Sequence, residues 1–393
     1  MRATSRVLLC TAILAVALLA FTAVSLTPTN FGEAVHIGVL GLSTQALAIG
    51  DFNGDGRADV AVTYLRCDPN NPGIDPQGCA SGDTNGRVVL LLGQGGGAFR
   101  LGERFVVGNS PKAIVKADLN ADGRLDLATA NFGSGSRGDV SILLGDGAGS
   151  MRAGRKLSLD GNPAHLAVGD FNADGKLDIA IALINNDRVA VALGDGKGGF
   201  GFPVEFEVGN APQSLALGDF NKDNKLDIAS ANVSKEESIS ILLGDGKGEF
   251  KRATTLAIDD APFAIAAADL NKDGNLDLAT AHAARLDSVV VFLGDGRGGF
   301  QRLGNFPAQN DPIALTFADF NGDAKPDVAV VNSITNSISV LLGDGSGALG
   351  TPASFTVGKS PLAMAAGDLN GDGKPDIATA NQNSHDVSIL LNR

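Results

Sequence analysis

A nine-residue phrase rich in carboxylates occurs seven times along the chain. Each copy has Asp at positions 1, 5 and 9 and Asn at position 3, and position 6 is Gly in five of the seven copies. Such a loop presents hard oxygen ligands around a sharp turn, and a backbone carbonyl at position 7 would add another. These donors suit Ca²⁺, because Mg²⁺ prefers a stricter octahedron and zinc or copper would need His or Cys at ligand spacing. The phrase therefore predicts up to seven structural calcium sites.

The predicted ligands are the side chains at positions 1, 3, 5 and 9 and the main-chain carbonyl at position 7. In chain order they are Asp51, Asn53, Asp55, Arg57, Asp59; Asp118, Asn120, Asp122, Arg124, Asp126; Asp170, Asn172, Asp174, Lys176, Asp178; Asp219, Asn221, Asp223, Lys225, Asp227; Asp269, Asn271, Asp273, Asn275, Asp277; Asp319, Asn321, Asp323, Lys325, Asp327; and Asp368, Asn370, Asp372, Lys374, Asp376. At position 6 the fourth and sixth copies have Asn224 and Ala324. Because Ala adopts a positive φ less readily than Asn, the sixth loop, Asp319–Asp327, is predicted to bind calcium most weakly.

The first five positions resemble the start of an EF-hand, but the rest of the sequence excludes that motif. An EF-hand needs Glu at position 12, where this chain has Val, Thr, Ile or Ser, and it needs flanking helices. The alternative is that Asp, Asn and Gly serve here only as turn formers. Seven copies in register favour the ligand interpretation.

The phrases lie in repeated units that must position them. Successive copies start 67, 52, 49, 50, 50 and 49 residues apart, and an insertion around Cys67–Gly86 explains the long first spacing. The fourth unit has four short runs of β-branched and small apolar residues, at 214–218, 227–231, 238–243 and 255–258. Four strands in a unit of this length are typical of a propeller blade. The sequence thus predicts an all-β, seven-bladed β-propeller spanning residues 31–393.

The two ends of the repeat array indicate how the ring closes. The seventh unit has three strands and stops at Arg393, whereas Phe31–Gly38 resembles the fourth strand of the other units. We therefore expect the N-terminal strand to complete the last blade, because closure removes exposed sheet edges.

Residues 1–26 differ from the rest of the chain. A basic start precedes a long uncharged apolar run, which is typical of a secretion signal, and an uncleaved N-terminal membrane anchor is the alternative. We expect a secreted, extracellular or periplasmic protein, or one anchored to the membrane exterior. In such a compartment Cys67 and Cys79 can pair, with two free thiols as the alternative.

The repeats resemble the FG-GAP/VCBS repeat family, which includes the β-propeller of integrin α subunits. The resemblance covers essentially all of residues 31–393 and rests on the D-x-[DN]-x-D-G-x-x-D phrase and a following G-D-G-x-G-x-F segment. It implies calcium-stabilised propellers at the cell exterior, often in adhesion or protein recognition. Asn224 and Ala324 depart from the family's loop glycine.

The composition argues against several functions. Acids outnumber bases 44 to 31, which argues against nucleic acid and anionic membranes as partners. The chain has no Trp, so a lectin is disfavoured. The histidines His36, His165, His282 and His385 share no ligand or triad spacing, and no nucleophile elbow or Walker loop occurs. We therefore predict a protein that is not an enzyme and has no cofactor besides calcium.

Two further motifs are interpreted as structural. Gly-Asp-Gly segments fall between the third and fourth strands, where a tight hairpin needs them, although a second metal or phosphate loop is the alternative. They occupy 145–147, 194–196, 244–246, 294–296 and 343–345. In the Arg137-Gly-Asp139 tripeptide, Asp139 aligns with Asp386 at the start of a strand, so we expect a structural role rather than adhesion.

Alternation of loops around each blade places the Asp-rich loops and the Gly-Asp-Gly turns on one face of the ring. The connections from second to third strand and from fourth to first strand then share the other face, and they vary most between units. Variable loops on a rigid scaffold commonly carry recognition. We predict a monomeric scaffold that binds an extracellular protein or polymer partner through this face. It would touch a membrane only through an uncleaved anchor. A secreted lyase or hydrolase and a lectin are the alternatives.

Overall fold

The structure is a computed structural model that describes residues 30–39, 43–65, 85–234 and 236–393. The predictions for residues 1–26, for Cys67 and Cys79 and for most of the insertion fall outside these residues. The described part of the chain is built of strands and turns, and it contains no helix that could cross a membrane.

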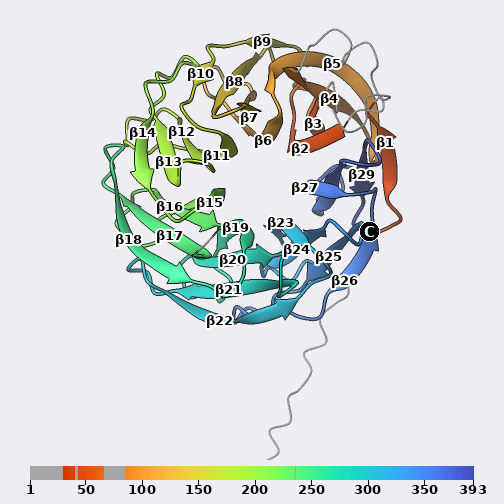
Figure 1. The fold of residues 1–393 in the computed structure, drawn as a ribbon. Helices are drawn as coiled ribbons and strands as arrows, with labels where there is room; N and C mark the ends of the chain where they lie inside the picture. The colour runs from red at the N-terminus through yellow and green to blue at the C-terminus, as the bar shows by residue number, and fades with distance from the viewer. Residues whose placement is uncertain (1–29, 40–42, 66–84, 235) are drawn as a thin grey trace, which may run out of the picture.

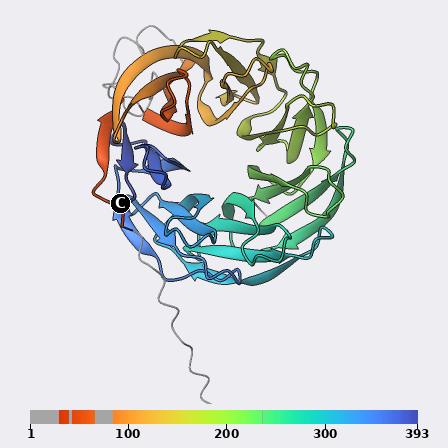
Figure 2. The ribbon, with the colours of Figure 1, turned by 180° about the vertical axis from the view of Figure 1, so that it is seen from behind.

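Seven antiparallel sheets stand around a central channel like the blades of a propeller (Figures 1 and 2). In each blade the first strand lies innermost and the fourth lies at the rim (Figure 1). The strands, blade by blade, are β2 (Ser43–Gly50), β3 (Asp59–Leu65), β4 (Asn85–Gly95), β5 (Ala98–Asn109); β6 (Pro111–Ala117), β7 (Asp126–Ser134), β8 (Arg137–Gly145), with β9 (Met151–Ala153) and β10 (Leu157–Ser158) sharing the fourth place; β11 (Pro163–Gly169), β12 (Asp178–Leu183), β13 (Arg188–Ala192), β14 (Val204–Glu207); β15 (Pro212–Gly218), β16 (Asp227–Asn232), β17 (Ser238–Gly244), β18 (Phe250–Ala257); β19 (Pro262–Ala268), β20 (Asp277–His282), β21 (Ser288–Gly294), β22 (Phe300–Pro307); β23 (Pro312–Ala318), β24 (Asp327–Asn332), β25 (Ser337–Leu341), β26 (Ala353–Thr356); and β27 (Pro361–Gly367), β28 (Asp376–Asn381), β29 (Asp386–Leu390), β1 (Val35–Gly38). The predicted all-β, seven-bladed propeller is confirmed.

The ring closes as predicted, with the N-terminal strand completing the last blade. Strand β1 pairs antiparallel with β29, from Val35 opposite Ile389 to Gly38 opposite Asp386. Just before β1, Phe31 forms a further bridge with Asn392. Closure of this kind covers the outer edge of β29, so the last blade has four strands and the free edges that remain are those of the fourth strands at the rim.

The apolar core is divided into seven clusters, each lying between two neighbouring blades. The second strands of blades 3 to 7 are buried along their whole length, and several second strands alternate Ala with β-branched residues, as in Asp178–Leu183. Because small residues alternate with larger ones, neighbouring sheets pack closely face to face. Because both faces of these strands are buried, their sequences are mostly small and apolar and do not alternate strictly between apolar and polar residues.

Position 2 of every Asp-rich phrase links one blade to the next. This residue is a buried Phe or Leu, and it shares a core cluster with the large apolar residue that follows the next blade's turn. Phe171 meets Phe250 edge to face at 5.6 Å between ring centroids, and Phe220 meets Phe300 at 5.5 Å. Phe31 takes the same place beside Phe320 at 5.8 Å, so the N-terminal segment also completes the apolar contacts of the ring.

Candidate metal loops

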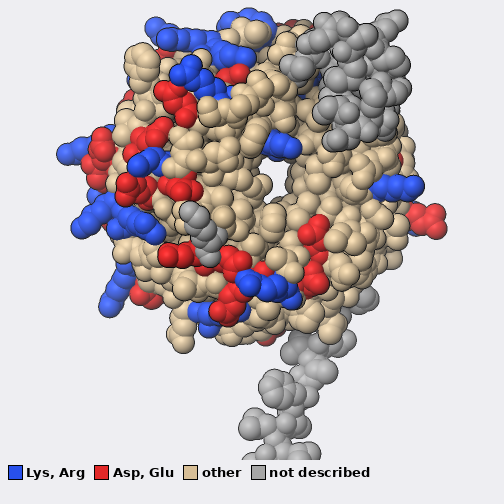
Figure 3. Space-filling model, in the orientation of Figure 1, with Lys and Arg blue, Asp and Glu red and all other residues tan. Residues whose placement is uncertain are grey.

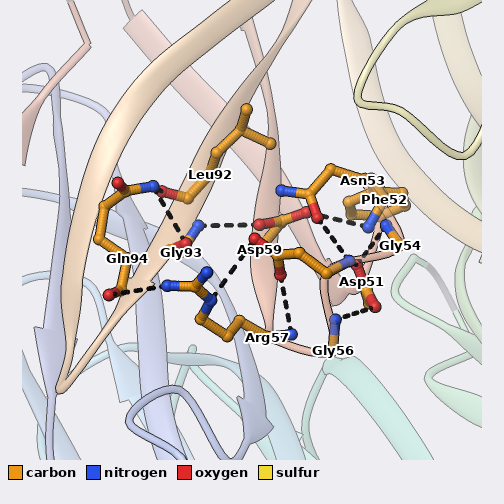
Figure 4. A network of polar contacts seen from close by, with 11 residues as sticks. Asp51, Phe52, Asn53, Gly54, Gly56, Arg57, Asp59, Leu92, Gly93 and Gln94 are labelled. Carbon is orange, nitrogen blue, oxygen red and sulfur yellow. Dashed lines mark hydrogen bonds and ion pairs between the residues drawn. The ribbon is translucent and has the colours of Figure 1, made fainter.

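The oxygens of positions 1 and 3 organise the backbone of every Asp-rich loop. In the first loop, the Asp51 carboxylate accepts hydrogen bonds from the backbone N–H groups of Gly54 at 2.7 Å and Gly56 at 2.8 Å. The Asn53 side-chain oxygen accepts from the Asp55 N–H at 2.9 Å (Figure 4). The bonds from the N–H groups of positions 5 and 6 recur in all seven loops. The oxygens of positions 1 and 3 in every loop therefore face backbone N–H groups of the same loop, and the position-5 carboxylate accepts the N–H of position 7.

A positive φ is required at two positions of each loop, not one. Position 6 has a positive φ in every copy, as predicted, including Asn224 at 60° and Ala324 at 61°. Position 4 also has a positive φ, and four copies place a side chain there: Ala121, Ala173, Lys222 and Lys272. The sequence analysis missed position 4 because Gly occupies it in only three copies. The fourth loop therefore has no glycine at either strained position.

The position-9 Asp is already engaged by the backbone. In the first loop the buried Asp59 carboxylate accepts from the Phe52 N–H at 2.9 Å and, from the end of β4, from the Gly93 N–H at 2.8 Å (Figure 4). The same two bonds occur in every blade, with Asn392 replacing the glycine in the seventh. Position 9 thus ties the loop to the end of the third strand, a role that its ligand-like spacing did not predict.

Burial raises the pKa of every position-9 carboxyl group, and it raises the pKa values of Asp227 and Asp327 to about 6. The backbone N–H donors oppose this shift because they stabilise the ionised form. Repulsion from the acids at positions 1 and 5 adds to it, as Asp219 and Asp223 do for Asp227. The three acids of each loop therefore lie close enough to repel one another.

Position 7 contributes a cation as well as its predicted carbonyl. In five loops its Arg or Lys side chain lies within ion-pair distance of the position-5 carboxylate. Lys176 lies 3.1 Å from Asp174, and this contact and the Lys176 N–H lower the pKa of that carboxyl. These side chains are partly exposed, so each pair contributes little to stability. They nevertheless supply positive charge beside the acids of the loop.

Among the described residues, no three His, Cys, Asp or Glu side chains already surround one metal position. The Asn at position 3 has to supply a side-chain oxygen, and the position-9 carboxylate faces two N–H groups. The donor set is made of oxygens alone, which suits calcium rather than zinc or copper. Calcium in these loops would be held by positions 1, 3 and 5 and the carbonyl of position 7, with position 9 placed behind them.

The Gly-Asp-Gly segments form turns, as predicted. In the second blade Asp146 accepts from the N–H groups of Ala148 at 2.8 Å and Ser150 at 3.0 Å. Gly149, which lies between these two residues, donates its backbone N–H to the carbonyl of Phe52 in the first blade's loop at 3.2 Å. Equivalent bonds join three further pairs of neighbouring blades. Loops and turns therefore share one face of the ring, here called the loop face.

On the other face, here called the opposite face, Asn–Ser bonds between neutral side chains recur in four blades. Asn232 at the end of β16 donates to Ser240 at 3.1 Å, and the Ser240 hydroxyl accepts from the N–H of Gly209 in the connection before the blade. Equivalent Asn–Ser bonds join Asn131 to Ser141, Asn332 to Ser339 and Asn381 to Ser388. These bonds fix the ends of the second and third strands beside the fourth-to-first connection.

Most of the remaining candidates lie apart from one another, but His36 and Asp386 lie 3.2 Å apart in the seventh blade. Asp139 accepts from the Asn131 side chain at 2.6 Å and Asp386 accepts from the Asn381 side chain at 2.7 Å, so these aligned acids have the same structural contact. His282 is buried, its Nδ1 lies 3.0 Å from the Asp260 carbonyl, and burial lowers its pKa to about 4. The other histidines lie in other blades.

Two family models match the repeats. The FG-GAP-like repeat model matches residues 118–181, 170–230, 219–280 and 319–379, and the FG-GAP repeat model matches residues 43–66. No curated protein matches the chain significantly.

Similar solved structures are distant in sequence. BBS1N in complex with ARL6DN is 13% identical with a TM-score of 0.63, covering 93% of this chain and 98% of that one. The periplasmic gluconolactonase of Pseudomonas aeruginosa is 18% identical, with a TM-score of 0.59 and coverage of 80% and 86%. A catalytically inactive virginiamycin B lyase from Staphylococcus aureus with quinupristin is 14% identical, with a TM-score of 0.60 and coverage of 92% and 99%. This likeness shows the propeller fold of the chain. Among these similar structures, the fold occurs both in a protein bound to a partner and in enzymes.

Proposed function

The chain belongs to the FG-GAP repeat family, and from this membership we propose that it is an exported, calcium-stabilised propeller that recognises an extracellular protein or polymer. Calcium is structural in this proposal. The observation that carries it is a loop repeated seven times on one face, in which the oxygens of positions 1 and 3 accept the backbone N–H groups of positions 6 and 5. The proposed export rests on the apolar run within residues 1–26.

Calcium would act on the packing of the blades as well as on the loops. Three neighbouring acids in each loop repel one another, and a bound divalent cation offsets that repulsion. Position 2 of the loop packs against the next blade and, in several seams, accepts a hydrogen bond from its turn. A cation that rigidifies the loop therefore also stabilises the contact between two blades.

Recognition is proposed for the opposite face because its neutral Asn–Ser bonds make a firm base for loops that differ between blades. In the sixth blade, for example, the second-to-third connection carries Ile334, whose side chain is 68% exposed. Lone exposed apolar residues are common on protein surfaces, but one on a variable loop over a fixed base suits a contact residue. The proposal assigns no catalysis to this face.

The calcium part of the proposal is tested by thermal unfolding of the full chain in 1 mM calcium, in 1 mM magnesium and in a chelator. A ligand at 100 times its dissociation constant adds about 2.7 kcal/mol per site, so several occupied sites should raise the melting temperature by on the order of 10 °C or more. Calorimetric titration should give up to seven sites. Equal melting in calcium and chelator would remove calcium from the proposal.

The recognition part is tested by binding to surface-exposed proteins and polysaccharides of the source cell, with lactones and esters assayed in parallel for turnover. Ile334→Glu on the opposite face should weaken binding at least tenfold. Lys247→Glu, at an exposed position in a Gly-Asp-Gly turn of the loop face, is the matched control and should leave binding unchanged. Turnover, or binding that changes only in the control variant, would contradict recognition by the opposite face.

A further inference from the structure

A cavity of about 810 Å³ lies at one end of the central channel. It is lined by the first strands of all seven blades near the residues where those strands begin, together with Phe132 and Ile184. Because the first strands begin at the fourth-to-first connections, the cavity opens on the opposite face. Figure 3 shows the channel opening at the centre of the molecule, with a largely uncharged rim and a basic side chain beside it.

A β-bulge aims one side chain from each blade into this cavity. The register shifts at the same point of every first strand, as between Pro111 and Ala113 in β6, and the residue inside the shift lines the cavity. Bulges redirect side chains and often occur beside binding sites. In blade order the seven bulge residues are Gln45, Lys112, Ala164, Gln213, Phe263, Ile313 and Leu362.

This ring of bulge residues is polar on one side and apolar on the other. Blades 1, 2 and 4 present Gln45, Lys112 and Gln213, and blade 3 presents Ala164. The residues that follow the bulge in blades 3 and 4 are His165 and Ser214, which also line the cavity. Blades 5 to 7 present Phe263, Ile313 and Leu362, and their next residues are all Ala. A symmetric repeat with no ligand to hold would not need this division. The cavity therefore suits a molecule with one polar end and one apolar body.

The polar side carries a cation that has no acidic partner. The Lys112 ammonium donates to the Gln45 side-chain oxygen at 3.3 Å, and no carboxylate of the described residues lies within ion-pair distance of it. No Asp or Glu lines the cavity, although the whole chain has a net charge of −13. Nearby, the Nδ1 atom of His165 is buried with no hydrogen-bond partner. An incoming negative group would be the counterion that Lys112 lacks.

We propose that this cavity binds an amphipathic monocarboxylate. The carboxylate would meet the Lys112 ammonium and the His165 ring, while an acyl or aryl body would lie against Phe263, Ile313 and Leu362. One cation matches one negative charge, because a dianion would leave an uncompensated charge inside the ring. The cavity volume falls within the range of small-molecule sites.

The experiment is calorimetric titration of the full chain in calcium buffer with octanoate and with 1-octanol, which shares the tail but carries no charge. Octanoate should bind at least tenfold more tightly than octanol. Lys112→Met should weaken octanoate at least tenfold and leave octanol unchanged, whereas Leu362→Gln should weaken both. Comparison of variants also cancels any binding of these amphiphiles to the apolar N-terminal run.

Lys116→Met is the matched control. Lys116 lies on the same strand, but its ammonium donates to the Ile49 carbonyl and its side chain is not part of the cavity lining. This variant should bind octanoate as the native chain does, and all variants should keep the native melting temperature. Equal binding of acid and alcohol by the native chain, no binding of either, or equal losses in Lys112→Met and Lys116→Met would overturn the proposal.

Discussion

The two faces of the propeller hold their blades together by different chemistry. On the loop face, a buried and ionisable Asp at position 9 accepts backbone N–H groups from the loop and from the third strand. On the opposite face, a neutral Asn reaches a Ser of the third strand. Both contacts tie strands of the same blade, but only the first carries a charge that pH and cations can change. The position-9 contacts of the loop face should therefore respond to pH and cations, whereas the Asn–Ser contacts of the opposite face should not.

The largest expected difference comes from removing one contact on each face. Asp277 accepts three backbone N–H groups, from Leu270, Asn271 and Gly294, so Asp277→Ala leaves two buried donors and one part-buried donor without this partner. We expect a loss of about 3–5 kcal/mol in the free energy of unfolding. Asn232→Ala on the opposite face should cost about 1–3 kcal/mol, because the hydroxyl groups around it can find other partners. Urea unfolding in chelator measures both losses without any contribution from calcium, and a larger loss for Asn232→Ala would reverse the comparison.

The next effect tests how closely the third strand must approach the loop. A Cβ on Gly194 would lie 2.1 Å from the Leu177 carbonyl oxygen. The backbone N–H of Gly194 also donates a hydrogen bond to the Asp178 carboxylate, so the backbone cannot move away without weakening that bond. Gly194→Ala should therefore cost about 2–4 kcal/mol through a forced backbone shift. Gly175→Ala in the same blade is the control: it has open space but a φ of 78°, so about 1 kcal/mol is expected. Similar losses in the two variants would show that the close approach is not needed.

A change of pH should act through the position-9 acids and, with the opposite sign, through the buried His165 and His282, whose pKa values burial lowers to about 4. In chelator, Asp227 has a folded-state pKa of about 6 against an ordinary value of 3.8. Between these values the folded protein binds a proton that the unfolded chain has released, so the free energy of unfolding falls as pH rises from about 4 to about 6. The share of one such group is roughly 1–3 kcal/mol. Asp227→Asn should flatten the slope of stability against pH in this window, whereas Asn232→Ala should leave the slope unchanged; an unaltered slope in Asp227→Asn would remove the ionisable role.

The sequence predicted the ring because repeats, strand runs and chain ends all carry their signal in local residue patterns. Phe31–Gly38 could be matched to the later fourth strands for that reason, and its pairing with β29 confirms the match. The double use of Asp277 could not be predicted, because its ligand-like spacing says nothing of the N–H groups that reach it from β21. The cavity was missed for the same reason: Lys112 and Phe263 lie far apart in the sequence, and only the bulges bring them to one ring.

The smallest predicted effect is a difference in calcium affinity between individual Asp-rich loops of the loop face. The sequence marked the sixth loop as weakest because of Ala324, but the fourth loop has Lys222 and Asn224 at its two positive-φ positions and no glycine at either. Both loops therefore store backbone strain that calcium binding must tolerate. Ala324→Gly should stabilise the protein by about 0.5–1 kcal/mol and raise calcium affinity at one site, and Lys222→Gly should do the same at another.

Gly322→Ala is the reverse control for these loop variants, since its φ of 75° is free of strain only for glycine. It should lower stability by about 1 kcal/mol and weaken the site that Ala324→Gly improves. Site-resolved calcium titration, read from the backbone amides of each loop by NMR, assigns each change to its loop. If Lys222→Gly improves its loop more than Ala324→Gly does, backbone strain summed over positions 4 and 6 ranks the sites. If neither variant changes calcium affinity, backbone strain at positions 4 and 6 does not rank the sites.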